Sequence, residues 1–371
     1  MKPLWLSLLL VFLPALATAH EMRPTIATAT IRDNGAFDLV LSLNLEAAMA
    51  GIGPEHSNTE ESPQSAAYEE LRALSPEALG ARFQTFAPRL EQAVGLQPEA
   101  SASEPLQIVS VSIPPVGDLA EARISEVTLS GTLPGSTDKV VWIFDPALGD
   151  SVIRLRASDA DKPFHSQYVS GPKSEAIPLD ESIQRRTSSV FAEYLQIGFV
   201  HIIPKGLDHI LFIVGLFLLS TRRSVLLWQV TAFTAAHTLT LALGSLGLVR
   251  ISPSIVEPLI ALSIVYVAVE NLATTRLTAW RPVIIFGFGL LHGLGFSGIL
   301  SEFELSGMDF ATGLIAFNIG VELGQLAVLA ACFLLVGWAM HMRDYRRLIV
   351  FPASLVIALI AGYWSIERAF A

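Results

Sequence analysis

The sequence predicts a multi-domain protein: an exported β-sandwich domain with a helical insert, followed by a polytopic α-helical membrane domain of six helices. Three observations lead to this prediction. Of the 371 residues, 52% are hydrophobic and only 16% are charged, which is too apolar for an ordinary soluble chain of this length. The N-terminus has the pattern of a signal peptide. Apolar runs of span length are confined to the second half of the chain, from about residue 197.

The export signal is expected at residues 1–19. Lys2 is followed by the apolar stretch LWLSLLLVFLPALA, and the small residues Ala17-Thr18-Ala19 form a cleavage pattern. The mature chain is therefore expected to begin at His20. The first domain should lie outside the membrane, in the periplasm, and the helical domain in the inner (plasma) membrane. The single cysteine, Cys332, lies in an apolar run, so the exported domain must be stable without a disulfide.

The exported domain is expected to occupy residues 20–180 and to contain a small antiparallel β-sandwich. Segments at 25–33, 36–45, 106–113, 122–131, 139–144 and 151–158 alternate or run apolar over strand length between turn-forming residues. A helical insert is expected at about 65–95, beginning with Ser75 as N-cap before Pro76. Pro88 is expected to break or kink this helix. Residues 181–196 are expected to be a linker.

The membrane domain is expected to occupy residues 197–371. Six apolar runs approach the ~20 residues that a spanning helix needs, at 197–220, 225–249, 254–273, 282–301, 310–340 and 347–367. With the first domain outside, both ends of the membrane domain are periplasmic. The inward loops then carry seven arginines, at 222, 223, 276, 281, 343, 346 and 347, against Arg250 and Arg368 on the outer side. This asymmetry is what the positive-inside rule expects.

Ionisable side chains fall near the middle of several expected spans. Counting ~1.5 Å per helical residue places them at similar depth, and they are Asp208, His209, His237, His292 and Glu322. Asn318 lies one turn above Glu322. A carboxylate at that depth costs several kcal/mol unless it is paired. A divalent transition metal held by imidazole and carboxylate would compensate this cost. His201 would share a face with Asp208 on an unbroken helix, but Pro204 and Gly206 favour a break between them.

Simpler interpretations remain open for each residue. A single histidine in a buried helix is often a hydrogen-bonded packing residue, and Glu322 could be a protonated hydrogen-bond donor. Asn318 and Gln325 could be ordinary polar contacts between helices, and the glycines of FGFGLLHGLG are expected to allow close helix packing. His20 could chelate a metal through its α-amine and ring, or be merely the first residue of the mature chain.

Four segments, HIIPKGLDHILF, AFTAAHTLTLAL, FGFGLLHGLGFSG and FNIGVELGQL, together resemble the HupE/UreJ family of membrane proteins, over roughly 195–370. The resemblance implies uptake of nickel or cobalt in support of hydrogenase and urease assembly. It also implies that the metal path is lined by His201, Asp208, His209, His237, His292 and Glu322. A periplasmic metal donor or metalloenzyme maturation proteins would be partners. One departure is that six residues separate His201 from Asp208, where nickel permeases have five or fewer.

The function predicted from the sequence is therefore a transition-metal permease, with nickel, cobalt or zinc as substrate and no tightly bound cofactor. The alternative is an intramembrane hydrolase, either a rhomboid-like serine protease using Ser297 in Gly-Phe-Ser-Gly or a zinc-dependent enzyme. An assembly or signalling protein is a third possibility. The net charge of −10 argues against a nucleic-acid partner. The oligomeric state is not predicted.

Overall fold

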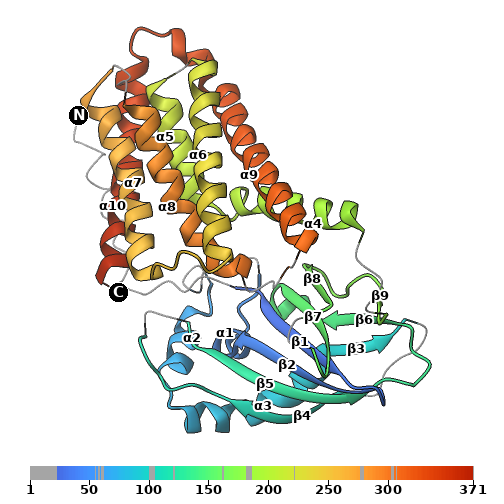
Figure 1. Cartoon of the computed structure of the whole chain (residues 1–371). Coiled ribbons are helices and arrows are strands. Elements are labelled where there is room, and N and C mark those ends of the chain that lie inside the picture. Colours follow the sequence, from blue (N-terminus) through green and yellow to red (C-terminus); the bar gives the residue numbers. More distant parts are fainter. Residues whose placement is uncertain are drawn as a thin grey trace.

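The computed structural model describes residues 23–54, 56, 59, 62–99, 105–119, 122–160, 163–180, 186–220, 222–275, 280–301, 305 and 307–370. The expected signal peptide and His20 lie outside these residues. Within them, a sheet-rich N-terminal part lies at one end of a bundle of long helices (Figure 1). This division into a sheet-rich and a helical part is the one that the sequence predicts.

The N-terminal part contains two sheets. The larger has the strand order β4-β5-β2-β1-β7-β8, and the smaller has the order β3-β6-β9. All six segments expected to be strands form strands: β1 (Thr25–Ile31), β2 (Ala36–Asn44), β4 (Gln107–Ser112), β5 (Ile124–Thr132), β6 (Lys139–Phe144) and β7 (Ser151–Ala157). Alternate residues of β2 are buried, beginning with Phe37 and Leu39, because one face of the strand lies on the core.

The expectation of a purely antiparallel arrangement was wrong. β1 pairs antiparallel with β2 on one side and parallel with β7 on the other, in a register that runs from Thr25–Ser151 to Ile31–Ala157. Alternation along a strand reports which face is buried, not the direction of a neighbour far along the chain. The sequence prediction also omitted β3 (Val94–Pro98), β8 (His165–Val169) and β9 (Ile177–Pro178).

The helical insert forms as α2 (Ser65–Arg72) and α3 (Pro76–Ala93), preceded by the short α1 (Leu45–Ala50). Ser75 caps α3 as expected, since its Oγ accepts a hydrogen bond from the backbone N–H of Ala78 at 3.3 Å. Of the expected break or kink at Pro88, the break was wrong, because α3 continues past the proline. The apolar face of α3 is held in the same core as the sheets, through Leu79, Phe83, Phe86 and Leu90. This tertiary burial outweighs the hydrogen bond that the proline removes.

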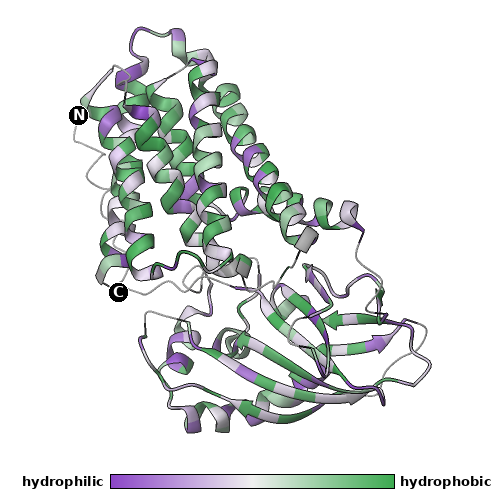
Figure 2. Ribbon diagram, viewed as in Figure 1, coloured by the Kyte–Doolittle hydropathy of each residue, from purple (hydrophilic) through white to green (hydrophobic). Residues whose placement is uncertain are grey.

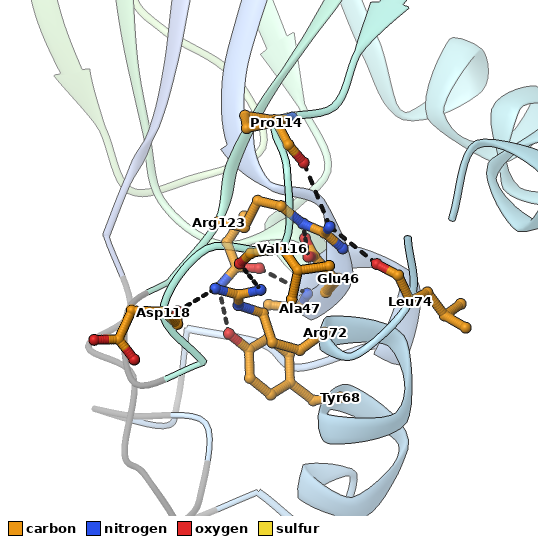
Figure 3. Close-up of polar contacts among 10 residues, drawn as sticks. Glu46, Ala47, Tyr68, Arg72, Leu74, Pro114, Val116, Asp118 and Arg123 are labelled. Carbon is orange, nitrogen blue, oxygen red and sulfur yellow. Dashed lines mark hydrogen bonds and ion pairs between the residues drawn. The ribbon is translucent and has the colours of Figure 1, made fainter. Parts of the chain in front are cut away.

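A buried ion pair ties α1 to the residue that precedes β5 (Figure 3). The Nε of Arg123 lies 2.7 Å from Oε1 of Glu46, and the two side chains are 1% and 0% exposed. Arg123 also donates to the carbonyl of Leu74, while Arg72 donates to the carbonyl of Val116 at 2.7 Å. These guanidinium groups fasten the segment before β5 to α1 and α2.

The C-terminal part contains α4 (Thr187–Ile202), α5 (Leu207–Leu219), α6 (Arg223–Ser245), α7 (Pro253–Ala273), α8 (Arg281–Ser301), α9 (Gly307–Val336) and α10 (Phe351–Phe370). Among the described residues, four helices are long and apolar enough to cross a membrane, and the bent pair α4–α5 would make a fifth. These helices consist mostly of hydrophobic residues (Figure 2).

The first expected span, 197–220, is not one straight helix. α4 and α5 meet at an angle of 68°, with Pro204 and Gly206 in the break, as the sequence predicted. A Cβ atom on Gly206 would lie 2.3 Å from the carbonyl oxygen of His201, so the turn requires a glycine. α4 begins at Thr187 and therefore occupies the second half of the segment expected to be a linker.

Candidate metal centre

Four histidines from four helices meet inside the bundle. His201 ends α4, His209 begins α5, and His237 and His292 lie in the middle of α6 and α8. One ligating nitrogen from each of His201, His209 and His237 lies within 4.8 Å of the other two. The ring of His292 lies 4.9 Å from that of His209, centroid to centroid. A single divalent ion between these rings would be within reach of at least three imidazoles after small side-chain shifts.

The tautomer of three of these rings is set by a hydrogen bond from Nδ1. His209 donates to Oδ1 of Asp208 at 2.9 Å, and His292 donates to the carbonyl of Phe288 at 2.9 Å. His237 Nδ1 lies 3.3 Å from Oδ1 of Asn318, whose amide nitrogen is in turn anchored to a backbone carbonyl of α9. Because each partner accepts at Nδ1, the Nε2 atom carries the free lone pair.

The Nε2 atoms of all four histidines are buried and have no hydrogen-bond partner among the described residues. A buried polar atom without a partner costs on the order of 1–3 kcal/mol, so such atoms are uncommon and call for an explanation. Four of them lie in one place, and the rings of His209, His237 and His292 are also held at Nδ1, which is the usual arrangement of histidine metal ligands and their supporting acceptors.

Phenylalanine rings enclose the imidazoles. The ring of Phe296 lies 4.3 Å from that of His201 and stacks on Phe317 at 5.1 Å. Phe233 lies 4.9 Å from His292, and Phe212 lies 5.6 Å from it. These rings keep the local dielectric low, which strengthens any interaction between a cation and the imidazoles or Asp208.

Glycines bring the histidine-bearing helices together. A Cβ atom on Gly293 of α8 would lie 2.3 Å from the carbonyl oxygen of His237, and one on Gly289 would lie 2.5 Å from that of Phe233. Likewise, a Cβ atom on Gly320 of α9 would lie 2.1 Å from a backbone carbonyl oxygen of α4. The prediction that the glycines of FGFGLLHGLG allow close packing is confirmed for Gly289 and Gly293, which bring α8 against α6, whereas Gly287 has nothing within 4 Å of the corresponding position.

The other candidate ligands take different positions. Asp208 and Asn318 lie at the site, where their side-chain oxygens contact Nδ1 of His209 and of His237. They therefore support the two histidine rings through Nδ1 and not through the unpartnered Nε2 atoms. Glu322 is not part of the His201–His209–His237 group. Its Oε1 accepts a hydrogen bond from Thr231, an exposed residue of α6, at 2.7 Å, and its Oε2 is buried without a hydrogen-bond partner among the described residues. The ligand role expected for Glu322 therefore stays a prediction.

Phe288, Phe296 and Phe317 were missed by the sequence analysis. Phe288 and Phe296 each lie four residues from His292, and Phe317 is adjacent to Asn318, so helical spacing could have identified them as neighbours of the site. Their apolar side chains do not stand out in membrane helices, which explains the omission.

The hydroxyl of Ser297 is engaged in a helix–helix contact and is not paired with a general base from the part of the chain that the structure describes. Its Oγ donates to the carbonyl of Leu294 at 2.9 Å, and its Cβ and Oγ fill the space beside Gly244, where a Cβ would lie 2.4 Å away. This is the geometry of a small residue at a tight helix–helix contact. It gives no support to a serine hydrolase.

Comparison with protein families matches residues 179–368 to the family described as HupE / UreJ protein. Comparisons with curated proteins and with solved structures give no significant match. The match covers α4 to α10, which carry all four clustered histidines. Together with the long apolar helices, it makes the protein a multi-pass membrane protein. The chain belongs to the HupE / UreJ family.

Proposed function

We propose that the protein is a transition-metal permease that carries nickel or cobalt, with zinc as a further ion that the same ligands accept. The observation that supports this proposal best is the group of buried Nε2 atoms of His201, His209, His237 and His292, which have no partner among the described residues. Neutral imidazole suits nickel, cobalt and zinc, whereas magnesium and calcium prefer oxygen ligands. The resemblance to nickel and cobalt permeases narrows the choice to the first two.

In the proposed topology, residues 1–19 export a β-sandwich domain to the periplasm, and six spans cross the inner membrane with both ends outside. α4 and α5 together form the first span. Exposed tryptophans at the inner ends of α6 and α9 and before α8 fit an interfacial belt, and they are Trp228, Trp338 and Trp280. His20, with its α-amine, would collect metal outside, from a periplasmic donor or from solution.

The imidazoles would replace the hydration shell of the ion, which the phenylalanine rings exclude. Asp208 would balance part of the ionic charge while fixing the ring of His209, and Asn318 would hold His237 in the same way. Glu322, at the seam between α6 and α9, would act later on the path rather than as a ligand of the first site. A divalent ion moving inward gains about 4.6 kcal/mol per 100 mV of membrane potential. Metalloenzyme maturation proteins would receive it inside.

The test is metal binding by the full-length protein purified in detergent, measured by mass spectrometry and by calorimetric titration with Ni²⁺. We expect His209→Ala and His292→Ala to lower the affinity by roughly 10- to 100-fold or more and to abolish uptake in cells. The matched control is His341→Ala, since this histidine is exposed beyond the end of α9. Wild-type binding and uptake in both site variants would refute the proposal.

The carboxylates separate binding from transport. Asp208→Asn is expected to weaken Ni²⁺ binding because Asp208 contacts His209 directly. Glu322→Gln is expected to leave binding within about twofold and to slow uptake, because Glu322 contacts Thr231 and not the histidines. Equal loss of binding in both variants would place Glu322 in the first site.

A further inference from the structure

A hairpin of the exported domain holds the broken helix pair on both sides of His201. Asp150, directly before β7, accepts hydrogen bonds at Oδ2 from the hydroxyl of Tyr168 at 2.6 Å and from Nζ of Lys205 at 3.0 Å. The backbone N–H of Tyr168, on β8, donates to Oε1 of Glu193 on α4 at 3.0 Å. We call these four residues, Asp150, Tyr168, Glu193 and Lys205, the hairpin clamp.

The contact has an apolar part as well. Ile26 of β1 and Val152 of β7 belong to the same buried cluster as Val190 and Tyr194 of α4, and Val152 is fully buried. Figure 1 shows α4 crossing beside α9 in the lower part of the bundle, on the side of β8. Burying one such side chain stabilises a contact by about 1.5–3 kcal/mol, so the domain is docked by a shared core and not only by polar groups.

The positions of the clamp residues give the contact its significance. Glu193 lies two turns before His201 on α4, and Lys205 lies in the break just after it. The helical hydrogen-bond ladder is interrupted between α4 and α5, so the angle between them has to be fixed by tertiary contacts. α9 packs on α4 through glycines, and the hairpin clamp secures the end of α4 that carries His201.

The polar side chains of the hairpin clamp lie at the edge of the contact and keep their hydrogen bonds at physiological pH. The side chain of Asp150 is 14% exposed and that of Lys205 is 42% exposed, so the pair lies at the rim of the contact. Burial raises the pKa of the Tyr168 phenol, with the Asp150 carboxylate acting in the same direction. The hydroxyl therefore remains a donor to Asp150 throughout the physiological pH range.

We infer that the exported domain positions a metal ligand: the hairpin clamp holds His201 within reach of His209 and His237, and its release withdraws His201 from the site. The inference rests on the proposed function, since it needs the imidazoles to bind metal. It gives the exported domain a defined task, which is to set the affinity of the membrane site. A docked domain corresponds to the high-affinity arrangement and an undocked one to an arrangement with fewer imidazole ligands.

The experiment compares Lys205→Met with wild type in the full-length protein, by Ni²⁺ titration and by X-ray absorption at the nickel edge. We expect Lys205→Met to lower the affinity by roughly tenfold or more and to reduce the number of imidazole ligands by one. Lys205→Arg, which keeps the charge and a donor, is expected to restore most of both. The matched control is Lys139→Met, which removes an exposed ion pair with Glu99 elsewhere in the domain.

Docking is measured separately, without metal. Spin labels at the exposed positions Val109→Cys and Leu248→Cys, in a Cys332→Ser background, report the distance between domain and bundle. Lys205→Met is expected to broaden the distance distribution. Broadening with unchanged affinity and ligand number overturns the positioning role, and so does an unchanged distribution with unchanged affinity. If the wild-type protein binds no nickel even at saturating Ni²⁺, the proposed function itself is overturned. The spin labels then still show whether the hairpin clamp docks the domain.

Discussion

A methyl group added at Gly293 should disturb the metal site by forcing two helices apart, and the size of this displacement can be calculated. In Gly293→Ala, the new Cβ would lie 2.3 Å from the carbonyl oxygen of His237 and 2.3 Å from Oγ1 of Thr240. Real Cβ atoms do not come closer than 3.0 Å to such an atom, so α6 and α8 must separate by at least the difference, 3.0 − 2.3 = 0.7 Å. Gly287, on the same helix, has nothing within 4 Å of the corresponding position.

The two substitutions share one effect and differ in another. Replacing glycine by alanine inside a helix is worth up to about 1 kcal/mol in helix propensity, and this applies to both. Only Gly293→Ala adds overpacking, which costs about 1–3 kcal/mol. The net difference in unfolding free energy between the variants should therefore be about 1–3 kcal/mol. The separation of His292 from His237 should also lower Ni²⁺ affinity by roughly 10-fold or more, since metal sites tolerate little displacement.

The assay is thermal unfolding of the purified full-length variants with and without Ni²⁺, together with a Ni²⁺ titration. Gly287→Ala is expected to melt at or above the wild-type temperature and to bind as wild type does. Gly293→Ala is expected to melt lower and to gain less stability from the metal, because a weaker ligand stabilises less at the same concentration. If the two variants melt together and bind equally, the close approach of α6 and α8 does not hold the site, and the reasoning fails.

Three further predictions concern single residues. Asn318→Leu should lower Ni²⁺ affinity by roughly 10- to 100-fold because His237 loses its Nδ1 partner, whereas Asn318→Asp, which keeps an acceptor, should bind within about tenfold of wild type by calorimetry. Arg123→Met should destabilise the sheet-rich N-terminal part by about 3–5 kcal/mol by leaving the Glu46 carboxylate buried and unpaired; the double variant with Glu46→Met should recover most of that loss in denaturant titrations. Burial raises the pKa of Tyr68 to about 12 from 10.0. Its contribution, at most about 2–3 kcal/mol, is complete below pH 10 and is lost as the pH rises towards 12, so Tyr68→Phe should flatten the stability decline in that window.

Local patterns carried most of the fold prediction. Alternation located β1, β2 and the other longer strands, and the N-cap pattern located the start of α3 at Ser75. Short strands such as β9, with two residues, have no alternation to detect. The parallel pairing of β1 with β7 joins segments from opposite ends of the domain, and nothing in either segment encodes the direction of the other.

The candidate site was predictable in depth but not in rotation. Counting residues along each span placed His209, His237 and His292 at one level, and the structure brings their rings together. Glu322 was placed beside them by the same count, yet it faces Thr231. The polar residues Asn318, Glu322 and Gln325 form a stripe on α9 that faces α6, where they contact His237, Thr231 and Thr234. The stripe indicates which face of α9 turns inward, but not the rotation that sets which α6 side chain each residue meets. Glycine contacts fix that rotation, and these depend on two helices at once.

In the proposed topology, the bend between α4 and α5 would also determine how the membrane voltage acts on the protein. α5 has 13 residues, about 20 Å, and the 16 residues of α4, about 24 Å, contribute only about 9 Å along the same axis at 68°. Together they cover about 29 Å, close to the ~30 Å of a hydrocarbon core. In that topology His209 would lie about 15 Å from the inner edge, halfway through the electric field. A divalent ion arriving from outside would gain about 2.3 kcal/mol per 100 mV before it is bound, which makes occupancy roughly fortyfold more favourable in an energised cell than in a detergent micelle.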